Sequence, residues 1–405
     1  MRIAQVDVNY GYSSTGKIVE SLSKSLIFNE DEFLCLYGRG TNSNSEVVYK
    51  YGLDVETIIH AGMTRITGYD AIYSPFSTWR LINKLKKFKP DIVHLHDLHG
   101  YHLNIGRLIK FLTASDIPVV WSFHCEYQYT GKCGHAFDCE GWLNQCGNCP
   151  QINVYPKSFY LDKTDKMLKQ KVSYFRSLKN PVITCPSEWL SDRVIQSHLS
   201  ASNVQVVPNG INNSEYFVPQ ESNIRKELGI ADDDFLILVI GSDIMSPAKG
   251  GKYIFELLPR IKNKKVKILV VGADQDEQAP NNQIIFLAKQ KSQHDLAKIY
   301  TASNVTLLLS RRETFSMVCA ESLSCGTPII GFEAGAPEKV APKPYGFFIE
   351  YGNLEALSKL VNSIMDKEVL LAGAKECAEF AIKNYSDIRM AENFKRIYEE
   401  RLKLL

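Results

Sequence analysis

Two glutamates stand eight positions apart, Glu313 and Glu321, within the stretch RRETFSMVCAESLSCGTPII (311–330). Apolar and small residues recur at helical spacing over 315–324, and the Cys-Gly-Thr-Pro sequence that follows predicts the end of a helix. Eight helical residues span about 12 Å and would leave the two carboxylates roughly 80° apart, on one side of the helix. Carboxylates in that arrangement could bind sugar hydroxyls at one end and ribose hydroxyls at the other.

The amino end of the predicted helix lies near Phe315, Ser316 and Met317. Backbone N–H groups without a helical partner and a partial positive charge at such an end favour a phosphate or a diphosphate. The whole stretch therefore suits a sugar nucleotide, with Glu313 on the sugar and Glu321 on the ribose. The alternative is that Glu313 is a solvated charge favoured by the helix dipole and that Glu321 is a surface residue.

Two lysines stand in a second candidate stretch, VIGSDIMSPAKGGKYIFELL (239–258), which predicts a strand, a loop and a helix that opens near Gly250. Lys249 and Lys252 lie at the predicted helix start, where they could neutralise a leaving diphosphate. Surface lysines in a loop are the alternative.

A glycine-rich turn follows the first predicted strand, where Gly11 to Lys17 spell GxxxxGK. A nucleotide-hydrolase P-loop needs Ser or Thr next, to hold magnesium, and this chain has Ile18. We predict instead a turn that lets the backbone amides of Thr15 and Gly16 approach a phosphate or an acceptor. A plain strand-to-helix turn is the alternative.

Histidines gather near two predicted strand ends. His124 ends PVVWSFH (118–124), where a neutral imidazole could hydrogen-bond a sugar hydroxyl beside the reacting carbon. His94 and His96 lie in VHLHDLHGYH (93–102), whose histidine density suggests a metal, although alternate strand positions put only two of them on one face. We favour hydrogen-bonded core histidines, or histidines that line a cleft.

Four cysteines crowd into one segment: Cys133, Cys139, Cys146 and Cys149. The Cys146–Cys149 pair has the spacing of half a zinc ribbon, so the four thiolates could close a tetrahedral structural zinc. That zinc would order an insertion, residues 125–150, with little core of its own. Redox or disulfide pairing and four unliganded thiols are the alternatives.

Strands and helices alternate twice along the chain, which predicts α/β structure with parallel sheets covered on both faces. The first set of strands is RIAQVDV, FLCLYG, DIVHLHD, PVVWSFH, PVITCPS and VQVVPNG. The second set is FLILVIG, VKILVVG, NQIIFLA, NVTLLLS and PIIGF. VVPNGINNSEYF (206–217) is the expected hinge, and the last residues read as an amphipathic helix.

The composition of the 405 residues, 45% hydrophobic and 23% charged, is that of a soluble globular protein of about two domains. We expect a cytoplasmic chain with reduced thiols, because no apolar run of membrane-spanning length and no secretory leader stand out. A net charge of +2 implies no general attraction to nucleic acid. Basic clusters at 80–90 and 157–179 suggest contact with anionic lipid at the inner membrane surface, or a solvated helix face.

The stretches VVPNGIN, AKGG and FLAKQKSQHDLAKIYTASNVTLLLSRRETFSMVCAESLSCGTPIIGFEAGAPE resemble the C-terminal half of retaining GT-B glycosyltransferases of the glycosyltransferase-four type. The resemblance covers nearly the full chain, and E-x7-E followed by CGTP is its most specific part. The first half matches more loosely, at Gly16, PDIVHLH and His124. SFHCEYQYTGKC and the cysteine run resemble the subgroup that builds bacterial exopolysaccharide, capsule or O-antigen units.

The resemblance implies a role for each matched residue. Glu321 would bind the donor ribose, Glu313 the transferred sugar, and Lys249 the diphosphate together with the amides of 315–317. Gly16 would face the diphosphate and His124 the reacting sugar. The donor-binding set is completed by Asn209 and Lys252. No metal would be required for catalysis.

One departure from the family concerns the diphosphate site. The family usually has Arg directly after the glycine at 241, and this chain has Ser242. A cation is therefore missing there, and Lys252 is the candidate that compensates.

These inferences predict a GT-B hexosyltransferase with two doubly wound Rossmann-like domains that face across a cleft. The acceptor would bind residues 1–207 and the nucleotide-diphosphate sugar residues 208–385, and helix 386–405 would pack back on the first domain. Transfer to a glycan or lipid-linked acceptor would retain anomeric configuration, as the resemblance implies. The alternatives are a sugar-nucleotide epimerase, a P-loop hydrolase and a non-catalytic member of a polysaccharide assembly complex.

Overall fold

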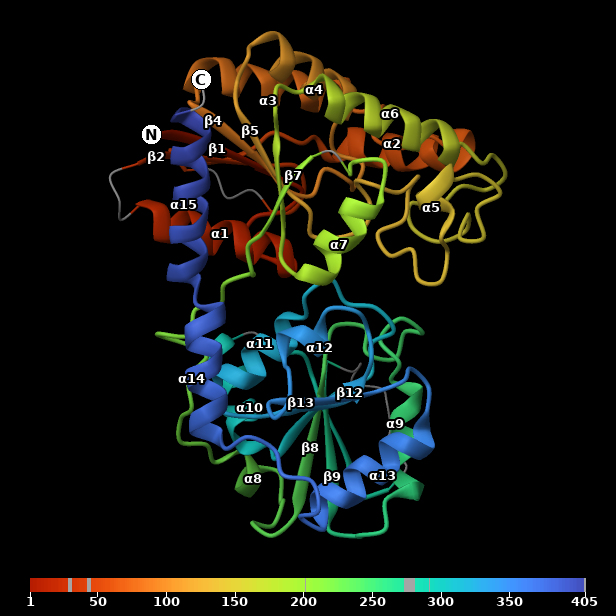
Figure 1. Ribbon diagram of the computed structural model, residues 1–405, viewed down its shortest axis with the longest axis vertical. Coiled ribbons are helices and arrows are strands. Elements are labelled where there is room, and N and C mark those ends of the chain that lie inside the picture. The colour runs from red at the N-terminus through yellow and green to blue at the C-terminus, as the bar shows by residue number, and fades with distance from the viewer. Residues whose placement is uncertain (28–30, 42–44, 201, 273–280, 291, 404–405) are drawn as a thin grey trace. The chain divides into compact units, whose positions relative to one another are not determined.

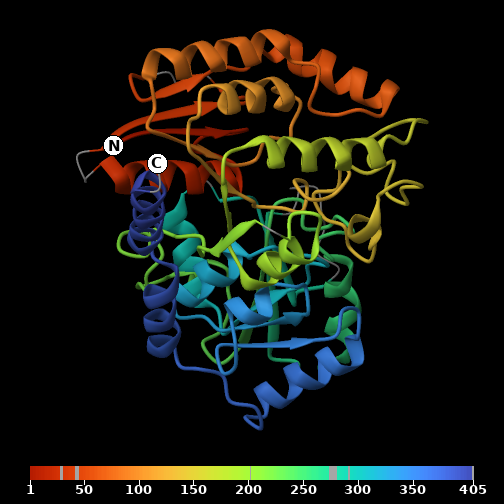
Figure 2. The same ribbon diagram turned by 45° about the horizontal axis from the view of Figure 1, so that its top comes forward.

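The computed structural model describes residues 1–27, 31–41, 45–200, 202–272, 281–290 and 292–403. These residues form two compact units, one of Met1–Gly210 with Ile388–Leu405 and one of Ile211–Asp387. Figure 1 and Figure 2 show that each unit is a sheet with helices on both faces. Among the described residues, no helix combines the length and the apolar character needed to cross a bilayer.

The first unit is built on seven parallel strands in the order β3-β2-β1-β4-β5-β6-β7. Their bounds are β1 (Arg2–Asp7), β2 (Glu32–Tyr37), β3 (Val48–Lys50), β4 (Ile92–Leu95), β5 (Val119–Ser122), β6 (Val182–Cys185) and β7 (Asn203–Val206). The strands read as continuous apolar runs because helices cover the sheet on both sides. The short strand β3 was not predicted from the sequence.

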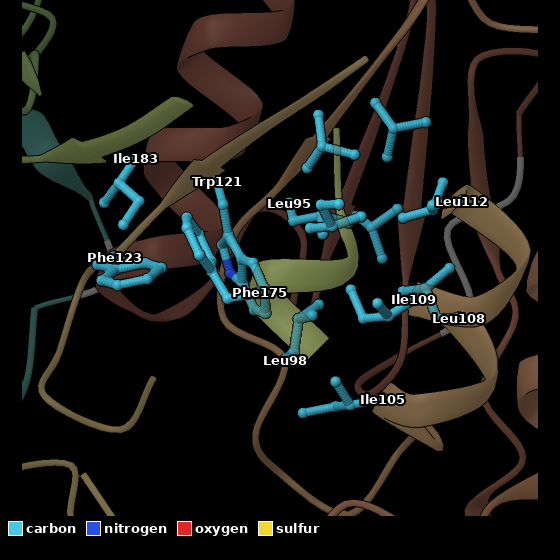
Figure 3. Packing of buried hydrophobic residues seen from close by; sticks show 14 of the residues in the cluster. Leu95, Leu98, Ile105, Leu108, Ile109, Leu112, Trp121, Phe123, Phe175 and Ile183 are labelled. Atoms are coloured by element: carbon cyan, nitrogen blue, oxygen red, sulfur yellow. The ribbon is translucent and has the colours of Figure 1, made fainter. Parts of the chain in front are cut away.

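Helices of the first unit cover both faces of this sheet (Figure 1). Their bounds are α1 (Ser13–Ile27), α2 (Asp54–Thr67), α3 (Pro75–Phe88), α4 (Ile105–Ala114), α5 (Gly141–Asn144), α6 (Thr164–Ser177), α7 (Glu188–Gln196) and α15 (Asp387–Lys403). Side chains of α3, α4 and α6 fill the core on one face. In Figure 3, Leu108 and Leu112 of α4 lie toward Leu95 of β4, and Trp121 lies beside Phe175 of α6.

Helix α15 packs on the opposite face of the first sheet. The Tyr398 hydroxyl lies 2.6 Å from Nδ1 of His94 on β4, and Phe394 contacts the same imidazole. Arg401 donates to the carbonyl of Lys179 at 2.6 Å. The chain therefore ends on the unit in which it begins, although the last two residues of the predicted helix lie outside the described residues.

The second unit is built on six parallel strands in the order β10-β9-β8-β11-β12-β13. The strands are β8 (Phe235–Ile240), β9 (Val266–Val271), β10 (Ile284–Leu287), β11 (Val305–Leu308), β12 (Ile329–Phe332) and β13 (Gly346–Ile349). The helices are α8 (Ile224–Glu227), α9 (Lys252–Leu257), the 3₁₀ helix η1 (Leu258–Arg260), α10 (Gln293–Ala302), α11 (Met317–Ser324), α12 (Pro337–Val340), α13 (Leu354–Met365) and α14 (Ala374–Tyr385). One apolar cluster joins α10, α11 and α14 to the sheet and another joins α9 and α13 to it. The prediction of two parallel α/β sheets is confirmed.

The chain passes between the units close to the predicted hinge. Ile211 donates to the carbonyl of Tyr385 and accepts from the amide of Asp387, at 2.9 and 3.0 Å, so it belongs to the second unit. Gly210 instead contacts the sulfur of Met390 in α15. The division after residue 210 therefore places Asn209 in the first unit, not in the second, where the donor-binding prediction had put it.

Candidate active site

Each sheet has one position where the strand order reverses, β1/β4 in the first and β8/β11 in the second. Open parallel sheets bind ligands beyond the carboxyl ends of their strands at such a position. The loops after β8 and β11 carry Lys249 and Glu313, and the segments after β1 and β5 carry Gly16 and His124. The candidate residues thus follow the strands where the topology favours a ligand.

Lys249 and Glu313 form an ion pair beyond the carboxyl ends of β8 and β11. Nζ of Lys249 donates to Oε1 of Glu313 at 2.7 Å, and their side chains are 36% and 18% exposed. The loop requires glycine at 250, because φ there is +73° and an added Cβ would lie 2.3 Å from the Leu309 carbonyl oxygen. The Arg311 amide bonds to the Ala248 carbonyl at 2.9 Å, which joins the two loops.

Glu313 lies before the helix that carries Glu321, as predicted, but the 12 Å and 80° estimates treated all eight residues as helical and do not apply. Glu313 forms an isolated parallel bridge with Gly335, and its amide bonds to the Ala334 carbonyl at 2.9 Å. Helix α11 begins four residues later, at Met317. The position of the Glu313 carboxylate is therefore set by the loop after β12 and by Lys249, and not by helical periodicity.

Ser316 makes the sharp entry into α11. It has φ 77° and ψ 90°, a region that non-glycine residues rarely occupy, and its hydroxyl accepts from the amide of Cys319 as the N-cap. Phe315, just before it, is buried, and its ring is nearly perpendicular to that of Tyr385, with ring centres 5.5 Å apart. Strained backbone of this kind costs about 1–3 kcal/mol and persists where the surroundings determine it, often at functional sites. The helix start predicted near 315–317 is where the structure has it.

Glu321 lies in α11 with a partner that the sequence did not reveal. The hydroxyl of Tyr300, in α10, donates to Oε2 of Glu321 at 3.0 Å. Burial, and then the charge of Glu321, raise the pKa of Tyr300, so this phenol stays a hydrogen-bond donor. Tyr300 therefore fixes one oxygen of the carboxylate at the position where we expect the donor ribose.

Three more basic residues occur in the loops and helix starts of this region. Lys252 opens α9, is exposed, and lies with Nζ 4.9 Å from the Tyr253 ring centre. Arg311 and Arg312 lie three and four residues beyond the end of β11 and are half-buried. Sequence reasoning overlooked these arginines, although two cations at the carboxyl end of a buried strand were a usable signal. The backbone of Arg311 contacts that of Ala248, next to Lys249, in a chain that has Ser242 where the family usually has Arg.

The corresponding edge of the first sheet, where the carboxyl ends of β4 and β5 lie, carries neutral histidines. Nε2 of His124 lies 3.0 Å from Nδ1 of His96, and the two rings are nearly parallel with centres 5.3 Å apart. Burial lowers the pKa of both, so the imidazoles are uncharged at neutral pH, as predicted for His124. His94 is fully buried and hydrogen-bonded to Tyr398 and Ser122, which confirms the core-histidine interpretation.

Two buried aspartates complete this edge and were missed in the sequence. Oδ2 of Asp97 accepts from the Thr15 hydroxyl at 3.0 Å, and the Asp97 amide donates to Asp7 at 3.0 Å. Burial, and then the charge of Asp97, raise the pKa of Asp7 well above its usual value. Among the described residues, ligand atoms of Asp97, His99 and Cys125 lie close enough together to hold a metal.

The P-loop alternative is wrong because the segment is helical. Helix α1 begins at Ser13, so Gly16 and Lys17 lie in its first turns and not in a loop. The turn is made by Gly11, whose φ is +74°. Gly16 instead permits close packing, since a Cβ there would lie 3.1 Å from Cβ of Asn9 and 3.2 Å from the Tyr10 amide. Contact of Gly16 with a diphosphate stays a prediction.

The cysteine-rich insertion is ordered by side-chain packing with the first unit. Trp142 is buried beside Tyr129 and under Arg193, whose guanidinium lies 4.5 Å from the indole. Arg193 also pairs with the fully buried Glu126 at 2.7 Å. Side chains of the insertion therefore join the core of the first unit, in agreement with the expectation that the insertion has little core of its own.

The four cysteines of the insertion are free thiols. A hydrogen bond from Cys133 lowers the pKa of Cys149 to about 7, and the same bond raises the pKa of Cys133. The amide of Gly131 donates to the sulfur of Cys146 at 3.2 Å. In the described part of the chain, the three-residue group that could hold a metal includes none of Cys133, Cys139, Cys146 and Cys149. A zinc on these four residues stays a prediction.

The fold and these two edges define a GT-B glycosyltransferase. Residues 29–215 match the family described as Glycosyltransferase Family 4, and residues 220–386 match the one described as Glycosyl transferases group 1. The two matches leave unmatched only residues 1–28, 216–219 and 387–405. Glycosyltransferase family models thus match both units in turn, and the chain is a hexosyltransferase-type glycosyltransferase.

Similar proteins span most of the chain. The putative colanic acid biosynthesis glycosyl transferase WcaC of Escherichia coli K12 is 22% identical over 385 residues, which cover 91% of each chain. The N-acetyl-alpha-D-glucosaminyl L-malate synthase of Bacillus anthracis is 22% identical and covers 56% of this chain and 61% of its own.

Solved structures share the fold at low identity. Sucrose-phosphate synthase from Thermosynechococcus elongatus has a TM-score of 0.71 at 14% identity and covers 100% of both chains. The Alr3699/HepE protein of Anabaena, solved in complex with UDP, has a TM-score of 0.69 at 14% identity and covers 99% of this chain and 100% of its own.

Proposed function

We propose that this glycosyltransferase moves a sugar from a nucleotide-diphosphate sugar to a glycan or a lipid-linked oligosaccharide, with retention of configuration, in bacterial surface polysaccharide biosynthesis. The Lys249–Glu313 pair, beyond β8 and β11 and beside the start of α11, carries the proposal. The relative named for colanic acid biosynthesis supports the pathway class. The Anabaena protein solved with UDP and with UDP-glucose supports a uridine donor as the first to test.

The Lys249–Glu313 ion pair would form in the absence of the donor and break when the donor binds. A partly exposed pair contributes only about 0–1 kcal/mol, so it exchanges partners easily. A diphosphate offers Lys249 a larger negative charge, and a hydrogen bond between charged groups contributes about 1.5–3 kcal/mol. Lys249 would turn to the phosphates, and Glu313 would then accept hydrogen bonds from hydroxyls of the sugar.

The start of α11 would hold the diphosphate from the other side. The first amides of an α-helix have no partner within it and carry the positive end of its dipole. Ser316 turns the chain abruptly there, so the amides at 316 and 317 are the ones we expect to meet phosphate oxygens. Glu321, with Oε2 held by Tyr300, would bind the ribose about one turn further along.

Transfer would then need little covalent participation by the protein. The acceptor hydroxyl attacks the anomeric carbon from the side the diphosphate leaves, the bond from that carbon to the phosphate oxygen breaks, and the departing oxygen takes the hydroxyl proton. Lys249 and the helix end stabilise the charge that develops on that oxygen. Neutral His124 would orient a sugar hydroxyl beside the reacting carbon. We expect no metal in this reaction.

A panel of nucleotide sugars tests the donor assignment. A true donor should raise the melting temperature of the protein, because it binds the folded state only. The Glu321→Ala variant should show a smaller shift with the same compound. Transfer to an acceptor, with product configuration read by NMR, then tests retention. Turnover to an epimer without acceptor would favour an epimerase, and no shift with any compound would contradict the proposed donor site.

A further inference from the structure

Helix α2 turns large apolar side chains toward solvent. Val55, Ile58, Ile59 and Ile66 are 70%, 74%, 55% and 62% exposed and recur three, four and seven residues apart, on one side of the helix. A Cβ added at Gly62, in the middle of that side, would meet nothing within 4 Å. Residues of this kind are normally buried, so an apolar stripe this exposed calls for a partner.

The same face continues onto α3. Phe76 and Trp79 are 67% and 62% exposed. The carboxylate of Glu56 in α2 accepts from the amides of Phe76 and Ser77 at 2.9 and 2.7 Å, which fixes the start of α3 beside the start of α2. Both helices lie on the outside of the first unit (Figures 1 and 2).

A loop extends the face at the other end of α2. The amide of Phe159 donates to the Arg65 carbonyl at 2.8 Å, which holds this loop against the last turn of the helix. Tyr160, next in the loop, is 89% exposed. We define the α2–α3 face by six exposed side chains: Ile58, Ile59, Ile66, Phe76, Trp79 and Tyr160.

Positive charge borders this face. Residues 80–90, in the last part of α3 and just after it, include five basic residues and no acid. Lys86 and Lys87 are exposed. The acids nearby are already engaged, since Asp54 pairs with Lys50 at 2.9 Å and Glu56 caps α3. Protein–protein interfaces are depleted in lysine, whereas Trp and Tyr with a basic border are typical of groups at an anionic bilayer surface.

We propose that the α2–α3 face docks on an anionic bilayer, with Ile58, Ile59 and Trp79 among the acyl chains and headgroups and with Lys86 and Lys87 near the lipid phosphates. Docking would bring the enzyme to a lipid-linked acceptor, and only this benefit rests on the proposed function. No residue of the proposed donor site takes part: most of that set belongs to the second unit, and Gly16 and Asn209 of the first unit are not among the side chains of the α2–α3 face.

Sedimentation of the full chain with vesicles tests this docking. Binding should be at least tenfold stronger to vesicles with roughly one third phosphatidylglycerol than to pure phosphatidylcholine, and high salt should weaken it. The double variant Ile58→Ser/Trp79→Ser should lose about tenfold or more in partitioning, and Lys86→Gln/Lys87→Gln should reduce the preference for anionic lipid. Leu370→Ser is the matched control, since Leu370 is 74% exposed, as Ile58 is, and lies in the second unit.

Several outcomes would overturn the docking. Equal binding to both kinds of vesicle, no binding at all, or a double variant that binds like the wild type would each contradict it. A dimer that the Ile58→Ser/Trp79→Ser variant dissociates would assign the face to a second copy of the chain instead. Thermal stabilisation by the donor should be unchanged in all these variants, so its absence would count against the donor site and not against the docking.

Discussion

The two sheets end in chemically different edges. Beyond β8 and β11, Lys249 and Glu313 are opposite charges 2.7 Å apart that stay partly exposed. Beyond β4 and β5, His96 and His124 are neutral, because burial lowers the pKa of each imidazole. In the proposed reaction this difference would separate two tasks, since a leaving diphosphate needs cations, whereas a sugar hydroxyl needs uncharged groups that can donate or accept a hydrogen bond.

The physical cause of the difference is solvent access. Burial disfavours charge at the first edge and raises the pKa of Asp7, and the buried Asp97 accepts a hydrogen bond from Thr15. At the second edge, Lys249 and Glu313 stay partly exposed, so water can solvate the two opposite charges of the ion pair. We infer that donor affinity depends on charge and that acceptor use depends on hydrogen bonds.

The largest effect should follow loss of the cation at the second edge. Lys249→Met should lower kcat/KM by about 10²- to 10³-fold, because one group that stabilises the departing charge is removed. Lys298→Met is the matched control, since Lys298 also has a 36% exposed side chain and pairs with an acid, Asp295, within α10. Steady-state kinetics that find equal losses in the two variants would remove the distinction between the edges.

The next effect concerns the ribose position. Glu321→Ala should weaken binding of the nucleotide diphosphate by about ten- to a hundredfold, since it removes a hydrogen bond to a charged group. Tyr300→Phe, which leaves the carboxylate but frees Oε2, should weaken it less. Calorimetry measures both. Unchanged affinity in the Glu321 variant would contradict the assignment.

A smaller effect is expected at the first edge. His124→Gln should lower kcat about tenfold, as expected when one hydrogen bond to the reacting sugar is lost, and should leave the affinity for the nucleotide diphosphate unchanged. Because burial lowers the pKa of His124 below its usual 6.5, the neutral form persists, and kcat should be flat from pH 8 to 6.5 and fall only below that. His198→Gln, at an exposed histidine, is the control. A fall already at pH 7.5 would show that His124 is not the titrating group.

The smallest effect tests the strained turn at Ser316. Ser316→Ala should lower the free energy of unfolding by about 1 kcal/mol, because the N-cap hydroxyl is lost while the positive φ stays. Ser316→Gly loses the same hydroxyl but adopts that φ without strain, so it should be nearly neutral. Urea unfolding compares them, and a glycine variant less stable than the alanine variant would exclude strain at this position.

Much of the fold could be predicted because buried parallel strands leave a plain apolar signal. NVTLLLS and PIIGF became β11 and β12, and Cys-Gly-Thr-Pro ended α11 as expected. The three-residue β3 escaped because so short a run has no periodicity. The spacing estimated between Glu313 and Glu321 failed, since the backbone bend at Ser316 has no counterpart in the pattern of side-chain types.

The site was predicted only where chemistry is local in sequence. The pairing of Lys249 with Glu313 joins residues 64 positions apart, and that of Thr15 with Asp97 joins residues 82 apart, so spacing could not reveal either. Tyr300 fits the apolar pattern of α10, and the sequence does not show that its hydroxyl contacts Glu321. The order of the cysteine insertion likewise depends on a distant residue, Arg193, which reaches Glu126 and Trp142 from α7.

A crystal structure of the enzyme with a bound nucleotide diphosphate tests the central claim most directly. We expect Nζ of Lys249 to have left Glu313 for a phosphate oxygen, with the phosphates against the amides of Ser316 and Met317. A complex in which Lys249 remains 2.7 Å from Glu313 while the phosphates lie elsewhere would contradict the assignment of this edge to the donor.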